Sequence, residues 1–368
     1  MLKISFHLKP GTMRKINDLS FEGETIFCGL DVHKKNWRVN VRDNEFELED
    51  FSQNPCADDL AKHLWHRYPN AKIKVAYEAG FCGFGIQRSL KQLGMECIVV
   101  NAADVPTTDK EKKRKQDKID ARKLCYNLSK KQLTAIYIPE LLMEHARSLV
   151  RQRARLVWDQ TRCKNRIWQL LMCHGLNVQA SREKQYWSSR FITSLKQLDC
   201  KSTFLRQTLD LAIEEFIYIW KLVNEGTRKL RKLGSEELFA QVQILIRSIP
   251  GIGLINSMVI LTEIQDIWRF KTLDSLCAYV GIVPDTENTG DIQRVKGITK
   301  RCNWYLRTAI VESSWSIIRQ DPALLMKYKG YCKRMQRNKA IIKIAKHLLS
   351  RIRYVWTNQM QYEIAIVK

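Results

Sequence analysis

An acidic residue in the middle of a buried strand is the feature of this sequence that most restricts its fold. Asp31 lies in the apolar run Thr25–Val32, which is followed by a polar break and then by the alternating run Asn36–Arg42. An apolar run, a turn and an alternating run predict two neighbouring strands of one hairpin. A carboxylate in a buried strand is costly unless a cation meets it. The cation that Asp31 meets is therefore a guide to the function of the chain.

Strands and helices alternate from Thr25 to about Leu133. The pattern predicts further strands at Glu45–Phe51, Lys72–Tyr77 and Met95–Val100, and helices at about Cys56–His66, Gly83–Leu93 and Lys118–Asn127. Three successive strands, followed by helix, strand, helix, strand and helix, predict a mixed sheet covered by helices. This order of elements is that of a ribonuclease-H-like fold.

Four carboxylates fall where these elements would converge. Asp31 lies in the first strand and Glu78 ends the fourth, while Asp117 and Asp120 share one face of the last helix because they are three residues apart. The first strand, the end of the fourth and the last helix meet at one edge of a ribonuclease-H-like sheet. Four carboxylates there predict a two-metal Mg²⁺ site of the kind that phosphoryl transfer uses.

Each of these acids has an ordinary explanation when it is taken alone. Asp120 would serve as a helix-start residue and Glu78 as a surface charge at a strand end. The nearest competing acids, Asp104 and Asp109, lie in a linker and are interpreted as loop or cap residues. The occurrence of all four acids at these positions is what favours the metal site.

The charge balance predicts a polyanionic partner. Lys and Arg number 62 against 38 Asp and Glu, and the resulting net charge of +24 favours nucleic acid. The alternative is a charged surface that only keeps the protein soluble. A cationic run directly precedes the acidic pair and is expected to hold phosphates; it contains Lys112, Lys113, Arg114 and Lys115.

Cysteine usage and hydropathy predict a cytoplasmic protein without a membrane partner. The 11 cysteines include no C-x-x-C pair, and their odd number with no secretory segment before them predicts reduced thiols and argues against zinc. No apolar run approaches the roughly 18 residues that span a bilayer. Residues 1–24 are expected to be a poorly ordered leader, followed by a domain at 25–135.

Residues 136–247 are predicted to form a helical linker region. Apolar residues recur there at alternating spacings of four and three, which favours a coiled-coil hairpin or a dimerising helix pair; they are Leu209, Ile213, Phe216, Trp220, Val223, Thr227 and Leu230. An earlier arginine-rich helix, at about Glu140–Cys173, would either follow a nucleic-acid backbone or lie exposed in a helical bundle.

Residues 248–368 are predicted to form a mostly helical domain that binds nucleic acid. Gly251 and Gly253 lie in a turn that resembles a helix-hairpin-helix, whose backbone amides would meet a DNA phosphate, or which serves only for packing. An exposed loop at 281–290 leads into the candidate binding residues Lys300, Arg301, Asn303 and Arg307, and two helices ending at Trp356 are predicted to follow. The span Met326–Arg353 has ten Lys or Arg and no acid, and includes Lys333, Arg334 and Arg337.

Together these motifs resemble one known family. The segments around Asp31, Glu78 and Asp117-x-x-Asp120 resemble the DEDD tetrad of the "IS one-ten" insertion-sequence transposases, also called Piv/MooV-type recombinases. The segments around Gly251, Pro284 and Asn303 resemble the C-terminal transposase domain of that family. The resemblance extends from about residue 25 to residue 356, with the motifs in the same order.

The resemblance implies properties that spacing alone does not. It implies a RuvC-like N-terminal domain joined through a coiled coil to a domain that supplies a nucleophilic serine, which forms a covalent link to DNA phosphate. It implies donor and target DNA as substrates, recognised through a structured non-coding bridge RNA, and a homodimer that assembles to a tetramer. It also implies a prokaryotic, nucleoid-associated protein.

One departure from the family concerns the nucleophile. Where the family has serine before Gly290, this chain has Thr289. A threonine hydroxyl is a competent nucleophile, but its methyl group crowds the attack and restricts χ1. The alternatives are a decayed copy that binds without cleaving, use of Thr286 instead, or a RuvC-like endonuclease that hydrolyses branched DNA without a protein nucleophile. Ser313 and Ser314, on a predicted helix, are weaker candidates.

Overall fold

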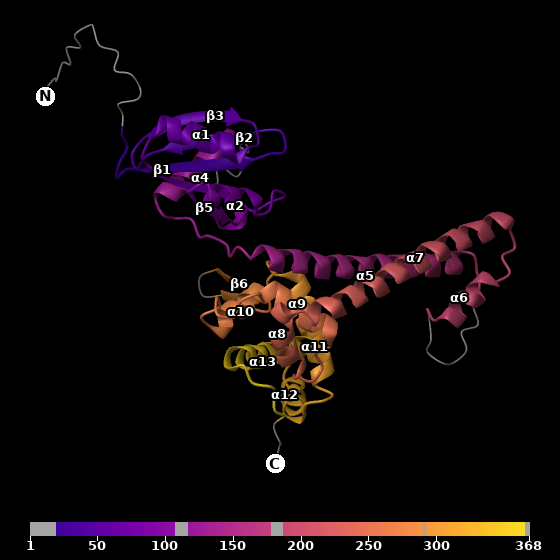
Figure 1. Cartoon of the computed structure of the whole chain (residues 1–368). Helices are drawn as coiled ribbons and strands as arrows, with labels where there is room; N and C mark the ends of the chain where they lie inside the picture. Colours follow the sequence, from indigo (N-terminus) through magenta and orange to yellow (C-terminus); the bar gives the residue numbers. More distant parts are fainter. Residues whose placement is uncertain (1–19, 107–116, 178–186, 290–291, 365–368) are drawn as a thin grey trace, which may run out of the picture. The chain divides into compact units, whose positions relative to one another are not determined.

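The computed structural model describes residues 20–106, 117–177, 187–289 and 292–364, apart from the side chains of 117–118 and 287–296. The chain divides into two compact units, Met1–Ile138 and Pro139–Lys368 (Figure 1). This division lies near the predicted boundary at 135/136. The predicted boundary at 247/248 falls within the second unit, where the helices on both sides of it share one core.

The first unit contains a five-stranded mixed sheet. β1 is central, and the order is β3-β2-β1-β4-β5, with β1 antiparallel to β2 and parallel to β4. This is the arrangement expected of a ribonuclease-H-like fold. The strands are β1 (Thr25–Val32), β2 (Trp37–Arg42), β3 (Glu47–Gln53), β4 (Lys72–Glu78) and β5 (Glu96–Val100).

Helices cover both faces of this sheet. The side chains of Ile26, Cys28 and Leu30 on β1 join the core that includes α1 (Ala57–Arg67) and α2 (Gly85–Gln92). Alternate residues of a strand point to opposite faces, so Phe27 points the other way, where it packs with Cys125 of α4 (Asp117–Ser129). Residues of odd number on β1, Asp31 among them, therefore belong to the face that α4 covers.

The regular secondary structure of the second unit, in the residues described, is helical apart from one β-hairpin. Its core forms around α9, which is buried from Ser257 to Ile264. Its elements are α5 (Leu141–Cys173), α6 (Ser189–Lys196), α7 (Thr203–Gly234), α8 (Glu237–Arg247), α9 (Leu254–Ile264), α10 (Leu273–Val280), β6 (Pro284–Thr289), β7 (Ile292–Ile298), α11 (Trp304–Ile317), α12 (Pro322–Cys332) and α13 (Arg337–Asn358).

The two long helices α5 and α7 lie side by side as a helical hairpin (Figure 1). Leu209, Ile213 and Phe216, which belong to the predicted heptad, pack in one cluster with Ile167 and Leu171 of α5. This contact within the chain accounts for that part of the apolar repeat. Dimerisation through these helices stays a prediction.

Two expectations for the C-terminal part were wrong. The segment expected to be an exposed loop at 281–290 contains β6, which pairs with β7 from Pro284–Ile298 to Thr289–Ile292. Three helices follow instead of two, because Asp321 caps α12 by accepting a hydrogen bond from the Leu324 amide, and Pro322 stands at its start. Strand pairing and local capping decide both features, and neither leaves an apolar period in the sequence.

Candidate active site

Asp31 and Glu78 lie at the carboxyl ends of adjacent parallel strands. The register between β1 and β4 runs from Thr25–Lys72 to Leu30–Tyr77, so each acid comes one residue after the last of these pairs. Ala76 of β4 packs with Cys125 of α4, and Glu78, two residues on, belongs to the same face of the sheet. Both predicted carboxylates are thus at one edge and on one face.

Gly29 allows α4 to lie directly against β1. A Cβ atom at Gly29 would overlap the carbonyl oxygen of Ala121 and the backbone nitrogen of Cys125. The Cys125 thiol also donates to the carbonyl oxygen of Phe27, at 3.1 Å. Along β1 from Phe27 to Gly29, the contacts on α4 therefore move back from Cys125 toward Ala121.

β1 and α4 therefore run in opposite directions, and two residues of the strand correspond to about one turn of the helix. Two residues of a strand rise about 6.7 Å, and four residues of a helix rise about 6 Å. The next step along β1 is Asp31, and the next turn back along α4 from Ala121 is residue 117. From these average rises we expect the backbone of Asp117 to lie level with Asp31; the side chain of Asp117 lies outside the described residues.

The side chains of Asp31 and Asp120 are partly accessible. Asp31 is 21% exposed, and its Oδ2 lies 3.1 Å from Nε2 of His33. Asp120 is 25% exposed and forms an ion pair with Lys123 at 3.5 Å. Partial exposure of both carboxylates is what access by a phosphate-bearing substrate would require.

The thiols beside β1 are poor candidates for chemistry. Burial raises the pKa of Cys28 well above its ordinary value and that of Cys125 to about 12. Both therefore stay protonated at neutral pH, and a protonated thiol is a weak nucleophile and a weak metal ligand. The carboxylate oxygens at this edge suit hard divalent cations.

The carboxylates fit such a cation by residue type and by their positions on the strands. Among the described residues, which leave out the side chain of Asp117, no group of three or more His, Cys, Asp or Glu lies close enough to hold a metal ion. The four-carboxylate site and its two Mg²⁺ ions therefore stay predictions.

Thr289 ends β6 in the second unit, opposite Ile292 of β7. Its side chain and residues 290–291 lie outside the described residues. Ser313 and Ser314, the weaker candidates, are buried in α11, where Asn256 donates to the Ser313 hydroxyl and Ser314 donates to the Ile310 carbonyl. Both therefore have internal structural roles, whereas Thr286 is exposed on β6.

The base of the β6–β7 hairpin is held by hydrogen bonds from both sides. The guanidinium of Arg307 donates to the carbonyl of Gly281, before β6, at 3.1 Å, and to that of Thr299, after β7, at 2.8 Å. Asn303 caps α11 and donates to Oε2 of the fully buried Glu263 at 2.8 Å. Internal bonds thus occupy Asn303 and Arg307, so a nucleic-acid contact would have to be made in addition.

The other predicted nucleic-acid-binding residues lie in different settings. Gly251 has φ +85° and packs so closely on α11 that a Cβ would lie 2.7 Å from the Ile317 nitrogen, so packing explains it. Gly253 is exposed at the start of α9. Among the predicted binding residues, five cations are exposed: Lys300, Arg301, Lys333, Arg334 and Arg337. Residues 112–115 lie outside the described residues.

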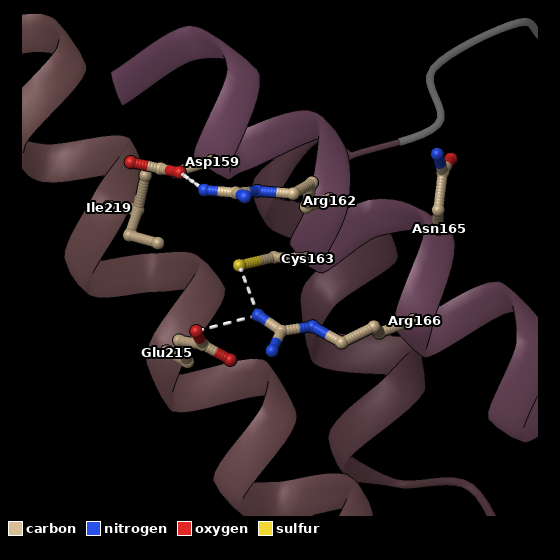
Figure 2. Close-up of a pocket in the computed structure, with 7 residues that line it drawn as sticks. All are labelled: Asp159, Arg162, Cys163, Asn165, Arg166, Glu215 and Ile219. Carbon is tan, nitrogen blue, oxygen red and sulfur yellow. Dashed lines mark hydrogen bonds and ion pairs between the residues drawn. The ribbon is translucent and has the colours of Figure 1, made fainter. Parts of the chain in front are cut away.

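A pocket of about 540 Å³ opens between α5 and α7 (Figure 2). Its two arginines are paired: Arg162 with Asp159, and Arg166 with Glu215 at 2.6 Å. Because carboxylates already neutralise these cations, the pocket is poorly suited to a phosphate. It belongs to the second unit, whereas Asp31, Glu78 and Asp120 belong to the first.

Sequence reasoning missed the buried polar groups that support these sites. Asp50 of β3 pairs with Arg38, and Glu263 of α9 pairs with Arg151 at 2.6 Å. Arg38 lies in a strand with a clear alternating pattern, which was a usable signal. The burial of Glu263 follows from tertiary packing and leaves no local pattern.

Comparisons with known proteins match both halves of the chain. A transposase family model of the DEDD IS110 type matches residues 28–174, and a model described as Transposase IS116/IS110/IS902 family matches residues 243–329. A putative transposase of Sinorhizobium fredii, y4qE, is 27% identical over 306 residues, which cover 79% of this chain and 71% of that protein.

Two further relatives carry similar names. Another putative transposase of Sinorhizobium fredii, y4rJ, is 25% identical over 88% of this chain and 90% of its own length. The transposase for insertion sequence element IS1111A of Coxiella burnetii is 23% identical over 56% of each chain. The first family match begins in β1 and includes all four predicted carboxylates, and the second includes the β6–β7 hairpin.

Proposed function

Because this chain belongs to the IS110-type DEDD transposases of insertion sequences, we propose that it cleaves and rejoins DNA through a covalent hydroxyl–phosphate intermediate, with divalent metal and a structured RNA. The observation that carries the proposal is the placement of Asp31 and Glu78. They lie at the ends of adjacent parallel strands, on the face where α4 begins.

Asp31, Glu78, Asp117 and Asp120 would hold the metal. Bound there, Mg²⁺ would supply Lewis-acid stabilisation of charge on a phosphate. The chain would contribute two strand ends and one turn of α4 to this site, and the close packing of α4 on Gly29 of β1 supports the assignment. Support for this assignment comes from the topology and from the family match to residues 28–174.

Thr289 is the proposed nucleophile. Its hydroxyl oxygen would form a bond to phosphorus while the bond between phosphorus and a DNA oxygen breaks, and the departing oxygen would take up a proton. Reversal of this step with another strand end would rejoin DNA with no net loss of phosphodiester bonds, so no ATP is needed. The hairpin supports this role because its base is tied to α10 and α11.

A covalent adduct at Thr289 is the expected signature of this mechanism. Incubation with cognate DNA, RNA and Mg²⁺ should give a protein–DNA band that survives denaturing electrophoresis, and Thr289→Ala should abolish it. Thr289→Ser should raise the rate of adduct formation by about tenfold, because removal of the methyl group opens the line of attack.

Thr286→Ala is the matched control, because Thr286 lies on the same strand and is exposed. It should leave the adduct unchanged; loss of the adduct in this variant would move the nucleophile to Thr286. Cleavage without any adduct would favour the RuvC-like endonuclease. Binding without cleavage would identify a decayed copy.

The proposed partners are donor and target DNA and a structured non-coding RNA, bound by a homodimer that assembles to a tetramer. The net charge of +24 supports polyanionic partners. The RNA is tested by expressing the gene with its flanking DNA, purifying the protein and sequencing the bound nucleic acid. A structured RNA from the flank, with loops complementary to the element's ends, would support guidance, and its absence would contradict it. No helix among the described residues is long and apolar enough to cross a membrane.

A basic pocket in the C-terminal part provides a candidate phosphate contact. It has a volume of about 430 Å³ and is lined by Tyr328, Lys329, Cys332, Lys333 and Arg337, of which three are cationic and none acidic. Surface cations release counterions from nucleic acid when they bind its phosphates. This pocket therefore supports a role for the end of α12 and the start of α13 in binding.

Neutralising Lys333, Arg334 and Arg337 to glutamine should weaken DNA binding and flatten its salt dependence. The slope of log K against log salt is negative, and its magnitude should decrease by up to about 0.9 for each phosphate that these cations no longer neutralise. Lys346→Gln is the control, because that lysine, also on α13, already pairs with Asp274 at 2.7 Å. An unchanged slope in the triple variant, measured by fluorescence anisotropy, would exclude these cations as phosphate-binding groups.

A further inference from the structure

Asp31 has a cation directly opposite it in the sheet. In the antiparallel register of β1 and β2, the residue across from Asp31 is Arg38. Residues opposite one another on antiparallel strands have Cβ atoms about 4.5–5.5 Å apart and share one face of the sheet. A guanidinium at this position can reach the carboxylate, and the two opposite charges attract one another.

Arg38 is instead turned toward β3. Its guanidinium pairs with the carboxylate of Asp50 and donates a hydrogen bond to the Ser52 hydroxyl at 3.1 Å. The side chains of Arg38 and Asp50 are 23% and 11% exposed, so this pair is largely shielded from water. The Nε donor of Arg38 is buried without a hydrogen-bond partner among the described residues. Asp50 and Ser52 therefore hold the guanidinium in place through its two terminal nitrogens.

Asp50 also faces a second arginine. Arg122 of α4 lies 3.9 Å from its Oδ2 and pairs with Glu47 at 2.6 Å. Asp50 is thus placed between a cation from β2 and a cation from α4, on the same face of the sheet as Asp31. Removal of the Asp50 carboxylate would take away the acid with which Arg38 pairs on β3. The acid opposite Arg38 on the other neighbouring strand, β1, is Asp31.

We propose that Asp50 is a positioning residue that holds Arg38 on β3, away from Asp31, and so preserves the negative charge of Asp31 for a divalent cation. This inference rests on the proposed function, because it takes Asp31 to be a metal ligand. Groups that orient or tune a ligand typically change metal affinity by about 10–100-fold when they are removed. A cation beside the ligand would lower metal affinity, because it repels the metal and occupies carboxylate oxygens.

The test is Mn²⁺ binding to the protein without DNA, measured by electron paramagnetic resonance and calorimetry. Asp50→Asn should weaken Mn²⁺ binding by about 10–100-fold. The double variant Arg38→Gln/Asp50→Asn should restore it, because the released cation is gone. Asp50→Ser repeats the test if Asp50→Asn does not fold, as judged by circular dichroism.

Glu49→Gln is the matched control. Glu49 is the preceding residue on β3 and also pairs with an arginine, Arg67, at 2.8 Å, but it bonds to α1 on the other face of the sheet. It should leave Mn²⁺ binding unchanged. Unchanged binding in Asp50→Asn, or a double variant as weak as the single one, would overturn the inference.

Asp31→Asn separates this inference from the function on which it rests. Strong loss of Mn²⁺ binding in Asp31→Asn, together with no effect of Asp50→Asn, would retain the metal site and remove the role of Asp50. Unchanged Mn²⁺ binding in Asp31→Asn would instead remove the metal-site assignment itself.

Discussion

Asp31→Asn should reduce DNA cleavage by about 10²–10³-fold or more, the loss expected when a group that stabilises transition-state charge is removed, while leaving nucleic-acid affinity nearly unchanged. The substitution keeps the shape of the side chain and removes its charge at the end of β1. Because Asp31 is 21% exposed and its strand is held by backbone pairing to β2 and β4, folding should be little affected. Cleavage of labelled DNA and gel-shift affinity measure the two effects separately.

Asp59→Asn is the control for this experiment. Asp59 is an exposed acid in the first turn of α1, which packs on the face of the sheet opposite α4. The Asp59→Asn variant should cleave DNA at the rate of the unmodified protein. Full activity in Asp31→Asn would remove Asp31 from the metal site, and a parallel loss of affinity would mean that the carboxylate acts in binding.

Arg151→Met should lower the melting temperature of the second unit by roughly 6–20 °C. Glu263 is fully buried, and Arg151 donates to both of its carboxylate oxygens, at 2.6 and 2.7 Å. Removing one partner of a buried pair costs about 3–5 kcal/mol, because the other charge is left buried. In a domain of this size, each kcal/mol corresponds to roughly 2–4 °C. Thermal unfolding followed by circular dichroism measures the shift.

A second ion pair on α5 is the comparison. Arg166 pairs with Glu215 at 2.6 Å, but the two side chains are 58% and 47% exposed. Pairs in water contribute about 0–1 kcal/mol, so Arg166→Met should change the melting temperature by no more than about 4 °C. The double variant Arg151→Met/Glu263→Met should recover much of the loss. Equal effects of Arg151→Met and Arg166→Met would show that Glu263 carries no buried charge.

The sheet of the first unit followed closely from the sequence. The predicted strand Thr25–Val32 has the bounds observed for β1, and no end of the other four strands differs from its prediction by more than two residues. Apolar runs and alternation specify such strands because one or both faces are buried. The position of Glu78 at a strand end was predicted, whereas Asp31 was expected in the middle of its strand and is the penultimate residue of β1.

The supporting contacts of the sites could not be predicted. β6 has the sequence Pro-Asp-Thr-Glu-Asn-Thr, which has no apolar alternation and forms a strand only through its pairing with β7. Arg307 and Asn303 looked like surface contacts for nucleic acid, but their polar groups are bonded to backbone carbonyls and to Glu263. Which polar side chains are turned inward depends on the packing of distant helices, and a linear pattern does not record it.

The close approach of α4 to Gly29 has a consequence for how such genes lose function. A mutation from glycine to alanine adds one methyl group at a position that carries no reactive atom, yet α4 would have to move away from β1. Asp117 and Asp120 move with that helix, so the four acids would all remain in the sequence while their spacing changed. Such a mutation would therefore alter the proposed metal site while keeping every carboxylate in the sequence.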